Sequence, residues 1–297
     1  MPWIEKSLGS IDFSKYKVIV VDNNSSDDTV KYVLRNYPQI KLIEQNKNIG
    51  FGQANNKGIS YALNQGAEQV FLLNQDAYLV EDCLDKLINF QQNNLEYGIL
   101  SPIHTNAKQN KLDRNFSNFL SYNKNSEFYS DHVLNNSIKP VYDVPFVNAA
   151  GWLINKKCLM TVGGFDPIFF HYGEDDNFCQ RVLYHNFKIG VVLKTFIIHD
   201  RENRNKPNLK PFSDEFFKLK ERQFKVRYAD INKSDAKTVD KEIFKIIKLI
   251  VKAGLKLQFK RLKALKRDLK RTRHNIKLIK RSYNNNQTPS PHYLKLD

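Results

Sequence analysis

The sequence predicts an α/β fold in which a mostly parallel sheet is flanked by helices on both sides. Short runs of β-branched residues alternate with segments of helical periodicity over residues 17–92, which is the order that βαβ units produce. The 297-residue chain is 41% hydrophobic, so it can bury a core of domain size. No stretch approaches the roughly 20 consecutive apolar residues that a membrane-spanning helix needs.

Three strands and three helices are expected in the first third of the chain. The apolar run KVIVVD predicts a buried strand, and SSDDTVKYVLRNY has the capping serine and early acids of a helix start. The predicted strands are 17–22, 41–45 and 69–74, and the predicted helices are 25–37, 50–63 and 81–92. In sheets of this kind ligands bind beyond the carboxyl ends of the strands. The first candidates for a functional site are therefore the polar groups that follow each strand: Asp22, residues 46–51 and residues 74–76.

The second third of the chain is less regular. Residues 104–143 are rich in Asn, Ser and Lys, and we expect loops and short antiparallel pieces at the sheet edge. Residues 147–167 predict a strand through Trp152 to Ile154, a short helix and a Gly-Gly turn. Three acids at 174–176 then begin a helix, and a strand follows that ends near His199.

The positive charge is concentrated near the C-terminus. The chain has a net charge of +16, and residues 241–281 contain 16 Lys and Arg against two acids, Glu242 and Asp268, a net charge of +14. We therefore expect a globular domain at 1–205, a basic helical extension at 206–282 and a disordered tail at 283–297. Such a charge suits nucleic acid, an anionic membrane surface or a phosphate-bearing ligand.

The cysteines and the N-terminus indicate a reducing compartment. Cys83, Cys158 and Cys179 share no CxxC spacing, so neither a disulfide framework nor a structural zinc site is predicted. The N-terminus lacks a charged region followed by an apolar one, which a secretory signal requires. We expect a cytoplasmic protein.

Four acidic or histidine positions carry the chemical signal, and each has a structural alternative. Asp76 follows a buried strand, where it would bind a divalent cation or begin a turn. One of the acids at 174–176 would deprotonate a substrate hydroxyl, or all three would simply favour the helix dipole. Asp22 would accept hydrogen bonds from a base or ribose, or cap a turn. His199 would bind a metal or be a hydrogen-bonded surface residue.

Four ordered motifs resemble the nucleotide-sugar glycosyltransferases of family 2, in particular their rhamnosyltransferase-like branch. They are VVDNNSSDDT, NKNIGFGQANNKGI, LLNQDAYL and NAAGWLINKKCLMTVGGFDPIFFHYGEDDNFCQR, and the resemblance covers roughly residues 1–205. The resemblance implies a GT-A fold, Mg²⁺ or Mn²⁺, and inverting transfer of a sugar from a UDP- or dTDP-type donor. The implied acceptor is a hydroxyl of a glycan or lipid-linked molecule in surface polysaccharide assembly.

The resemblance also implies roles for single residues on the donor side. Asp22 matches the aspartate that recognises the pyrimidine base, and Asp76 the metal-binding aspartate of the family's DxD motif. Asn74 replaces the first aspartate of that motif and is at most a weak ligand or a ribose contact. His199 resembles a late metal or diphosphate contact. Further residues of the nucleotide-lining segment are Asn48, Gly50, Phe51 and Asn55.

On the acceptor side, Glu174 and Asp175 match the family's ED motif. Asp175 is then the catalytic base, and Glu174 orients the acceptor. Gly151 and Trp152 resemble the wall of the acceptor site, and Arg181 is expected to pair with an acid or a phosphate.

The resemblance also predicts a missing strand. Family members begin with a strand of the type VSIIIVTYN, the central first strand of the sheet, followed by a helix that MPWIEKSLGSI resembles. Without that strand we expect open backbone hydrogen bonds and a gap in the core.

The basic extension has a helical apolar stripe. We interpret it as an amphipathic helix on the inner face of the cell membrane, with a helix pair on the domain or a coiled coil as alternatives. A nucleic-acid-binding protein is the rival from another class, but the extension has no interleaved aromatics apart from Phe244 and Phe259, and we expect no nucleic acid partner. A non-catalytic nucleotide-sugar binder is the third possibility. The stripe consists of Ile243, Ile247, Ile250, Gly254 and Leu257, then Leu262, Leu265, Leu269, Thr272, Ile276 and Ile279.

Overall fold

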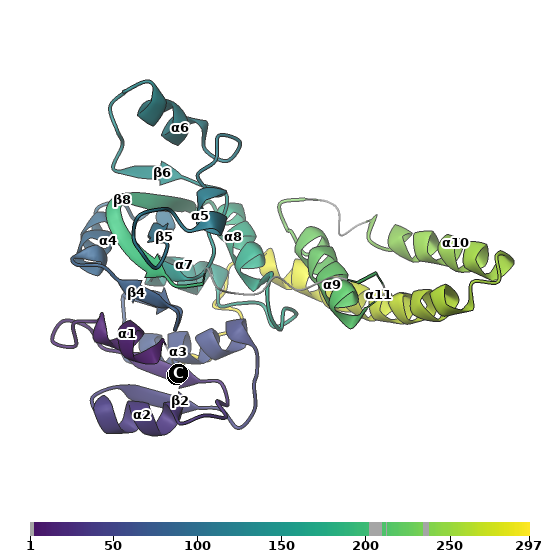
Figure 1. The fold of residues 1–297 in the computed structure, drawn as a ribbon, viewed down its shortest axis with the longest axis horizontal. Coiled ribbons are helices and arrows are strands. Elements are labelled where there is room, and N and C mark those ends of the chain that lie inside the picture. Colours follow the sequence, from purple (N-terminus) through teal and green to yellow (C-terminus); the bar gives the residue numbers. More distant parts are fainter. Residues whose placement is uncertain (1–2, 202–209, 212, 234–237) are drawn as a thin grey trace.

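In the computed structural model, two sheets with flanking helices form a body, and two long C-terminal helices project from it (Figure 1). The structure describes residues 3–201, 210–211, 213–233 and 238–297. The strands are β1 (Ile19–Asp22), β2 (Lys41–Glu44), β3 (Gln69–Leu73), β4 (Ala77–Leu79), β5 (Tyr97–Thr105), β6 (Val141–Asp143), β7 (Gly151–Asn155) and β8 (Lys188–His199). The helices of the body are α1 (Ile4–Gly9), α2 (Thr29–Asn36), α3 (Phe51–Asn64), α4 (Cys83–Gln92), α5 (Arg114–Ser117), α6 (Ser126–Val133), α7 (Lys156–Val162) and α8 (Glu174–Tyr184). The C-terminal helices are α9 (Asp214–Tyr228), α10 (Lys241–Leu255) and α11 (Phe259–Asn286).

The main sheet is mixed, so the expectation of a mostly parallel sheet is wrong. Its strand order is β3-β7-β5-β8-β4, with β6 also paired to β8. Only β5 and β8 are parallel neighbours, whereas β7 runs antiparallel to both β3 and β5. The βαβ alternation in the sequence covers only the first strands. The next strand, β4, follows β3 after three residues, a connection too short for a parallel crossover.

The longest buried strand of the first half, β5, was not anticipated from the sequence. All nine of its residues are buried, although Pro102 lies in its middle. Proline removes a hydrogen-bond donor and is normally confined to sheet edges or bulges. Here Pro102 lies where the β5–β8 register shifts between Ser101 and Ile103, so the irregularity accommodates it.

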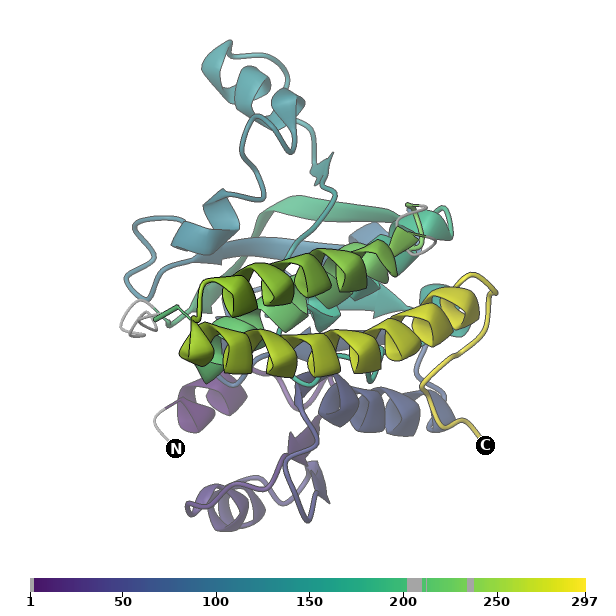
Figure 2. The same cartoon turned by 90° about the vertical axis from the view of Figure 1, so that its right-hand side faces the viewer.

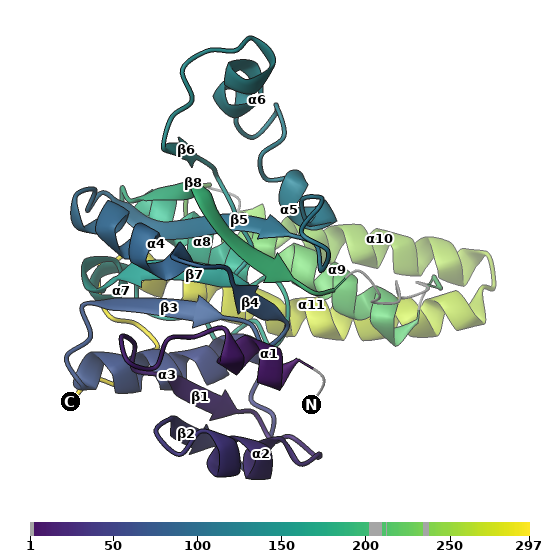
Figure 3. The same ribbon diagram turned by 60° about the vertical axis from the view of Figure 1, so that its left-hand side comes forward.

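The expected gap in the core is present, between β1 and β3. β1 and β2 form a separate parallel pair, and within the described residues no strand pairing joins β1 to β3. Figure 3 shows β3 and β1 apart, with α1 and α3 between them in this view, and residues of both strands line one cavity. Ile19, Val20 and Val21 of β1 are only half-buried. Apolar side chains of β1 and β3 therefore line a cavity between the two strands.

At the edge of the sheet, residues 104–143 hold both the expected antiparallel piece and two helices. β6 pairs with the middle of β8 in antiparallel register, as expected. The two short helices α5 and α6 begin at Asp113 and Asn125, whose side chains accept backbone hydrogen bonds as N-caps.

The described part of the basic extension holds α9 and, after it, the antiparallel pair α10 and α11, in place of one amphipathic helix (Figure 2). Most of the predicted apolar stripe of α11 faces inward, because Leu265, Thr272, Ile276 and Ile279 are buried. In α10 the buried positions are Ile246 and Ala253, while the predicted Ile247 is exposed. In α11 the stripe is thus used mainly for packing inside the molecule, which was one of the alternatives, whereas in α10 Ile247 and the following Leu257 are exposed.

The tail predicted to be disordered is ordered and packs on the body. Helix α11 runs on to Asn286, and Asn286 donates a hydrogen bond to buried Asp166. Tyr293 also donates to Asp166, and Leu294 and Leu296 pack against the main core. The polar, proline-containing tail is held because it supplies both donors for a buried carboxylate and apolar side chains for the core.

Candidate active site

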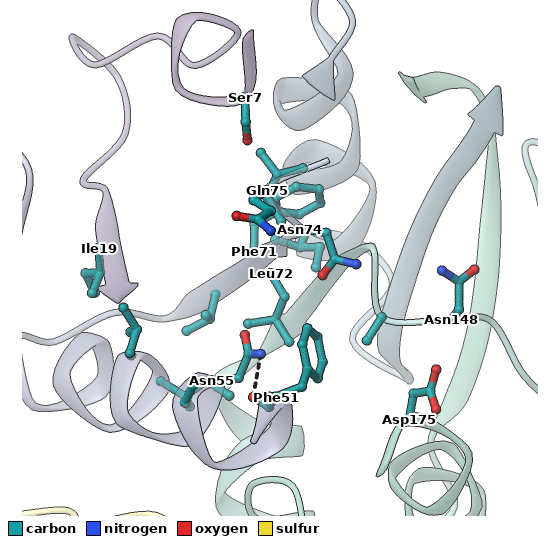
Figure 4. Close-up of a pocket in the computed structure, with 18 of the residues that line it drawn as sticks. Ser7, Ile19, Phe51, Asn55, Phe71, Leu72, Asn74, Gln75, Asn148 and Asp175 are labelled. Carbon is teal, nitrogen blue, oxygen red and sulfur yellow. Dashed lines mark hydrogen bonds between the residues drawn. The ribbon is translucent and has the colours of Figure 1, made fainter. Parts of the chain in front are cut away.

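A cavity of about 1960 Å³ joins the strand ends to the start of helix α8. Figure 4 shows Asn74 and Gln75 after β3, Phe51 and Asn55 on α3, and Asp175 at the beginning of α8, all on this opening. The cavity also extends into the gap between β1 and β3. Most of the candidate residues therefore come together in one place; those that line the cavity are Asp22, Phe51, Asn55, Asn74, Asp76, Glu174, Asp175 and His199.

The turn after β1 shapes one end of the cavity. Asp22 is 7% exposed, and its Oδ2 accepts a hydrogen bond from the backbone N–H of Ser25 at 3.1 Å. Asn48 Oδ1 accepts from the backbone N–H of Gly50 at 2.9 Å. Asp22 thus caps a turn, which was the structural alternative for this residue. It also lies on the cavity wall. Asn48 and Gly50 hold the neighbouring loop and do not line the cavity.

Gly50 is required where its loop meets the segment before α8. Its φ is +86°, and a Cβ at this position would lie 2.1 Å from the carbonyl oxygen of Phe170. Both the backbone conformation and the contact exclude a side chain. The nucleotide-lining segment and the acidic helix start are therefore in direct contact here.

We expect Gly50→Ala to lower the free energy of unfolding by about 2–4 kcal/mol, because it combines backbone strain with a clash. Gly66→Ala is the matched control, since Gly66 has φ +82° and nothing within 4 Å of its Cβ position. Strain alone should cost the control only about 1 kcal/mol. Urea unfolding of both variants measures the difference, and equal losses would show that the Phe170 contact relaxes.

Asp76 and His199 meet on adjacent strands at the cavity. Asp76 is 2% exposed, and its Oδ2 lies 3.7 Å from Nε2 of His199. Ala77 and His199 are partners in the β4–β8 register, which brings the two side chains together. Within the described residues no group of three or more His, Cys, Asp or Glu side chains could hold a metal ion. A carboxylate and an imidazole fit Mg²⁺ or Mn²⁺ only if other oxygens, such as those of a diphosphate, complete the coordination.

Three carboxyl groups at the start of α8 have raised pKa values. Burial raises the pKa of Glu174 to about 7, helped by the charge of Asp175. Burial likewise raises the pKa of Asp176 to about 6 and raises that of Asp175 above its usual range. Glu174 is 4% exposed, and its Oε2 has no hydrogen-bond partner. Perturbed acids of this kind in a cleft indicate a functional site.

Helix α9 lies in the predicted basic extension, yet its residues, among them Arg222, line the cavity. Burial raises the pKa of each of the three acids, and the positive charge of Arg222 on α9 partly opposes that rise. Its guanidinium carbon also lies 5.3 Å from the ring centroid of Tyr172. Asn148, whose Oδ1 is buried without a partner, points into the opening near Asp175 (Figure 4). No local motif marks Arg222 or Asn148, because their place depends on how distant segments pack.

Three predicted residues lie in the core instead of the cavity. Trp152 is fully buried and stacks on Phe165, with ring centroids 6.0 Å apart. Gly151 is next to it in β7, where a Cβ would lie 2.7 Å from Ile197. Neither residue lies on the wall of the cavity, and their role beside an acceptor stays a prediction. Arg181 is also fully buried, and it donates to Oδ1 of Asn177 and to the backbone carbonyls of Val162 and Gly164. These hydrogen bonds go to amide groups, where the sequence led us to expect an acid or a phosphate.

Solved glycosyltransferase structures share this fold. The crystal structure of GalNAc-T7 with UDP, GalNAc and Mn²⁺ superposes with a TM-score of 0.54 at 12% identity, covering 75% of this chain and 44% of that chain. S. aureus TarS 1-349 in complex with UDP-GlcNAc superposes with a TM-score of 0.50 at 15% identity, covering 97% and 87%. The mixed sheet and flanking helices of this chain thus have the GT-A-like fold of these structures.

The sequence places the chain within one family. Residues 4–157, just over half of the chain, match the family described as glycosyl transferase family 2. The chain belongs to this family of glycosyltransferases.

Curated relatives are distant. The dTDP-rhamnosyl transferase RfbF of Shigella flexneri is 25% identical over 61% of this chain and 59% of its own length. The low-salt glycan biosynthesis hexosyltransferase Agl10 of Haloferax volcanii is 25% identical over 62% and 58%. The N-acetylglucosaminyl-diphospho-decaprenol L-rhamnosyltransferase of Mycobacterium tuberculosis is 23% identical over 61% and 66%. The matches therefore span about three fifths of the length of these relatives.

Proposed function

We propose that this protein transfers a sugar from a nucleoside-diphosphate sugar to a hydroxyl of a glycan or lipid-linked acceptor, with inversion at the anomeric carbon. The observation that carries the proposal is the single cavity shared by Asp22, Asp76 and Asp175. Family membership supports the same chemistry. The relatives that act on dTDP-rhamnose or on decaprenol-linked glycans favour a pyrimidine nucleotide donor and surface polysaccharide assembly.

The donor is bound along the strand ends. Asp22 accepts hydrogen bonds from the base, and Phe51, Asn55 and Asn74 line the nucleotide path. Asp76 and His199 would hold Mg²⁺ or Mn²⁺, which when bound stabilises negative charge on the leaving diphosphate. Asn74 has an amide where a second carboxylate would stand, so the site carries less negative charge against the diphosphate.

The acceptor is activated at the start of α8. Asp175 removes the proton of the acceptor hydroxyl as its oxygen attacks the anomeric carbon opposite the diphosphate, which gives inversion. Burial raises the pKa of Asp175, which makes its carboxylate a stronger base. Glu174, with a pKa of about 7, retains a proton over much of the physiological range and orients the acceptor oxygen by hydrogen bonding.

We also propose that the protein works in the cytoplasm at the inner face of the cell membrane, where lipid-linked acceptors are available. Among the described helices none is long and apolar enough to cross a membrane. The glycosyltransferase domain at 1–205 and the basic extension at 206–282 divide these tasks, although Arg222 of α9 reaches the acidic cluster.

Thermal unfolding with UDP, dTDP or GDP, each with and without Mn²⁺, tests donor binding. We expect one pyrimidine nucleotide to raise the melting temperature in a metal-dependent way, because a ligand that binds only the native state stabilises it. At a ligand concentration of 100 Kd the gain is about 2.7 kcal/mol. Asp76→Asn should abolish the Mn²⁺-dependent part of the shift.

Asp28→Asn is the matched control for that variant. Asp28 is exposed, pairs with Lys31 on the surface, and does not line the cavity. It should leave the nucleotide shift unchanged. A shift that survives in Asp76→Asn would remove Asp76 from metal binding, and the absence of any shift with all three nucleotides would contradict the proposed donor class.

A further inference from the structure

Helix α10 carries three rows of side chains in a repeated order. Its sequence reads IFK, IIK, L, IVK, A, GLK from residue 243 to 256. The first member of the first three groups faces α11, since Ile246 is buried and Ile243 and Ile250 are half-buried. In the last turn the buried residue is Ala253, and Gly254 is exposed. Because successive residues are about 100° apart around a helix, the second members form a row beside the first, and the third members form a row almost opposite the first.

The second row is apolar and exposed. We call it the outer apolar row; it consists of Phe244, Ile247, Val251 and Leu255. Phe244 is 65% exposed and Leu255 is 83% exposed. The turn that follows continues the surface, since Leu257 and Phe259 are 72% and 71% exposed. Exposed apolar surface of this extent indicates an interaction site.

The third row consists of lysines. Each residue of the outer apolar row is followed directly by a lysine, so the lysine row borders it along the whole helix: Lys245, Lys248, Lys252 and Lys256. All four are exposed. Of the two acids of residues 241–281, Glu242 pairs with Lys245 of this row and Asp268 pairs with Lys220 of α9. Lys248, Lys252 and Lys256 supply the remaining charge of the row. The surface next to the outer apolar row is therefore strongly positive.

The position of these rows leaves them accessible. The turn between α10 and α11 is the end of the helix pair that lies farthest from the sheets (Figures 1 and 3). The buried row already packs on α11, so the outer apolar row is not needed for that contact.

We propose that α10 and the following turn dock on an anionic phospholipid bilayer. The outer apolar row lies among the upper acyl chains, and the lysine row contacts headgroup phosphates, the arrangement of an interfacial amphipathic helix. Charge selects this partner over a second copy of the chain, because two such surfaces would bring like charges together. It also selects a bilayer over nucleic acid, which would leave the outer apolar row uncovered.

Vesicle sedimentation of the full chain tests the proposal without any sugar transfer, so it can fail independently of the proposed activity. Vesicles of phosphatidylcholine with about 30% phosphatidylglycerol are compared with phosphatidylcholine alone. We expect binding only to the anionic vesicles, weakened by 0.5 M salt, since the Debye length shrinks as ionic strength rises. In Leu255→Trp, tryptophan emission should shift to the blue on binding, because the indole enters an apolar environment.

Two triple variants that keep all charges test whether binding needs the outer apolar row. The triple variant Phe244→Ser, Val251→Ser and Leu255→Ser should lower vesicle affinity about tenfold or more. The matched control replaces Tyr129, Val133 and Leu134 by Ser; these residues are 54%, 62% and 67% exposed on and directly after α6, and their loss should leave binding unchanged.

The proposal is overturned if the triple variant binds anionic vesicles as well as the unmodified chain, or if neutral and anionic vesicles bind alike. It is also overturned if the triple variant abolishes self-association in sedimentation velocity while the unmodified chain ignores vesicles, since the surface would then join two copies. Binding to an oligonucleotide but not to vesicles would assign the lysine row to nucleic acid.

Discussion

Asp175→Asn is expected to reduce sugar transfer by about 10²- to 10⁴-fold, the contribution of a positioned general base. The amide cannot accept a proton from the acceptor hydroxyl, but it has nearly the same shape and hydrogen-bonding reach. Donor binding, measured as the nucleotide-dependent rise in melting temperature, should be retained. The rate is measured as release of UDP or dTDP from UDP-GlcNAc or dTDP-rhamnose, with water or an added glycan as acceptor.

The pH dependence of the unmodified enzyme follows from the same residue. Burial raises the pKa of Asp175 above the ordinary 3.8, so kcat/KM should rise with pH through a limb that lies above the range in which an ordinary aspartate titrates. Below this limb Asp175 is protonated and cannot act as a base. Asp175→Asn should remove the limb along with the rate.

Glu174→Gln is the matched control for Asp175→Asn. It removes the neighbouring acid while retaining a hydrogen-bond donor. The rate of sugar transfer should therefore fall about tenfold or less, and kcat/KM should still rise with pH through the acid limb. If Asp175→Asn retained most of the activity and Glu174→Gln lost it, the base would be Glu174. Because the pKa of Glu174 is raised to about 7, this substitution should also stabilise the fold above pH 7 and have little effect below pH 4.5.

The sequence predicted the first βαβ units and the residues at their strand ends because both signals are local. Strand β1, helix α3 and strand β3 lie within a residue or two of their predicted bounds, and Asp22, Asn74 and Asp76 line the cavity as expected of residues at strand ends. Periodicity and end position determine these features before any tertiary contact forms.

What could not be predicted depends on contacts between distant segments. Trp152 was assigned to the cavity, but it is in the core because Phe165 and Phe178 cover it. Arg222 reaches the acidic cluster because α9 packs against α8; the side chain of Gln180 on α8 donates to the carbonyl of Val226 on α9. The tail is ordered through Asp166, more than 100 residues away in the sequence. No local pattern in the sequence encodes such pairings.

A strand placed between β1 and β3 is expected to raise the free energy of unfolding by about 3–5 kcal/mol. Both strands present an edge to the gap, and the cavity there is lined by Val20, Val21, Val70 and Phe71. Burial of about five apolar side chains would contribute roughly 1.5–3 kcal/mol each to the free energy of unfolding. Fixing the backbone of each residue would cost about 1–2 kcal/mol. The added strand would also pair open backbone groups. For a chain of this size the melting temperature should rise by about 10 °C.

The experiment joins a segment such as VSIIIV upstream of residue 1 and compares it with a Gly/Ser segment of equal length. The double variant Val20→Ser, Phe71→Ser tests whether the added strand lies between β1 and β3. It should reduce the rise in melting temperature that the apolar segment gives, and it should affect the chain with the Gly/Ser segment less. Equal melting temperatures for the two extensions would show that α1 and α3 close the gap by themselves. A gain in stability accompanied by tighter nucleotide binding would follow from the shared cavity, since the strand that fills the gap ends beside Asp22 and Asn74.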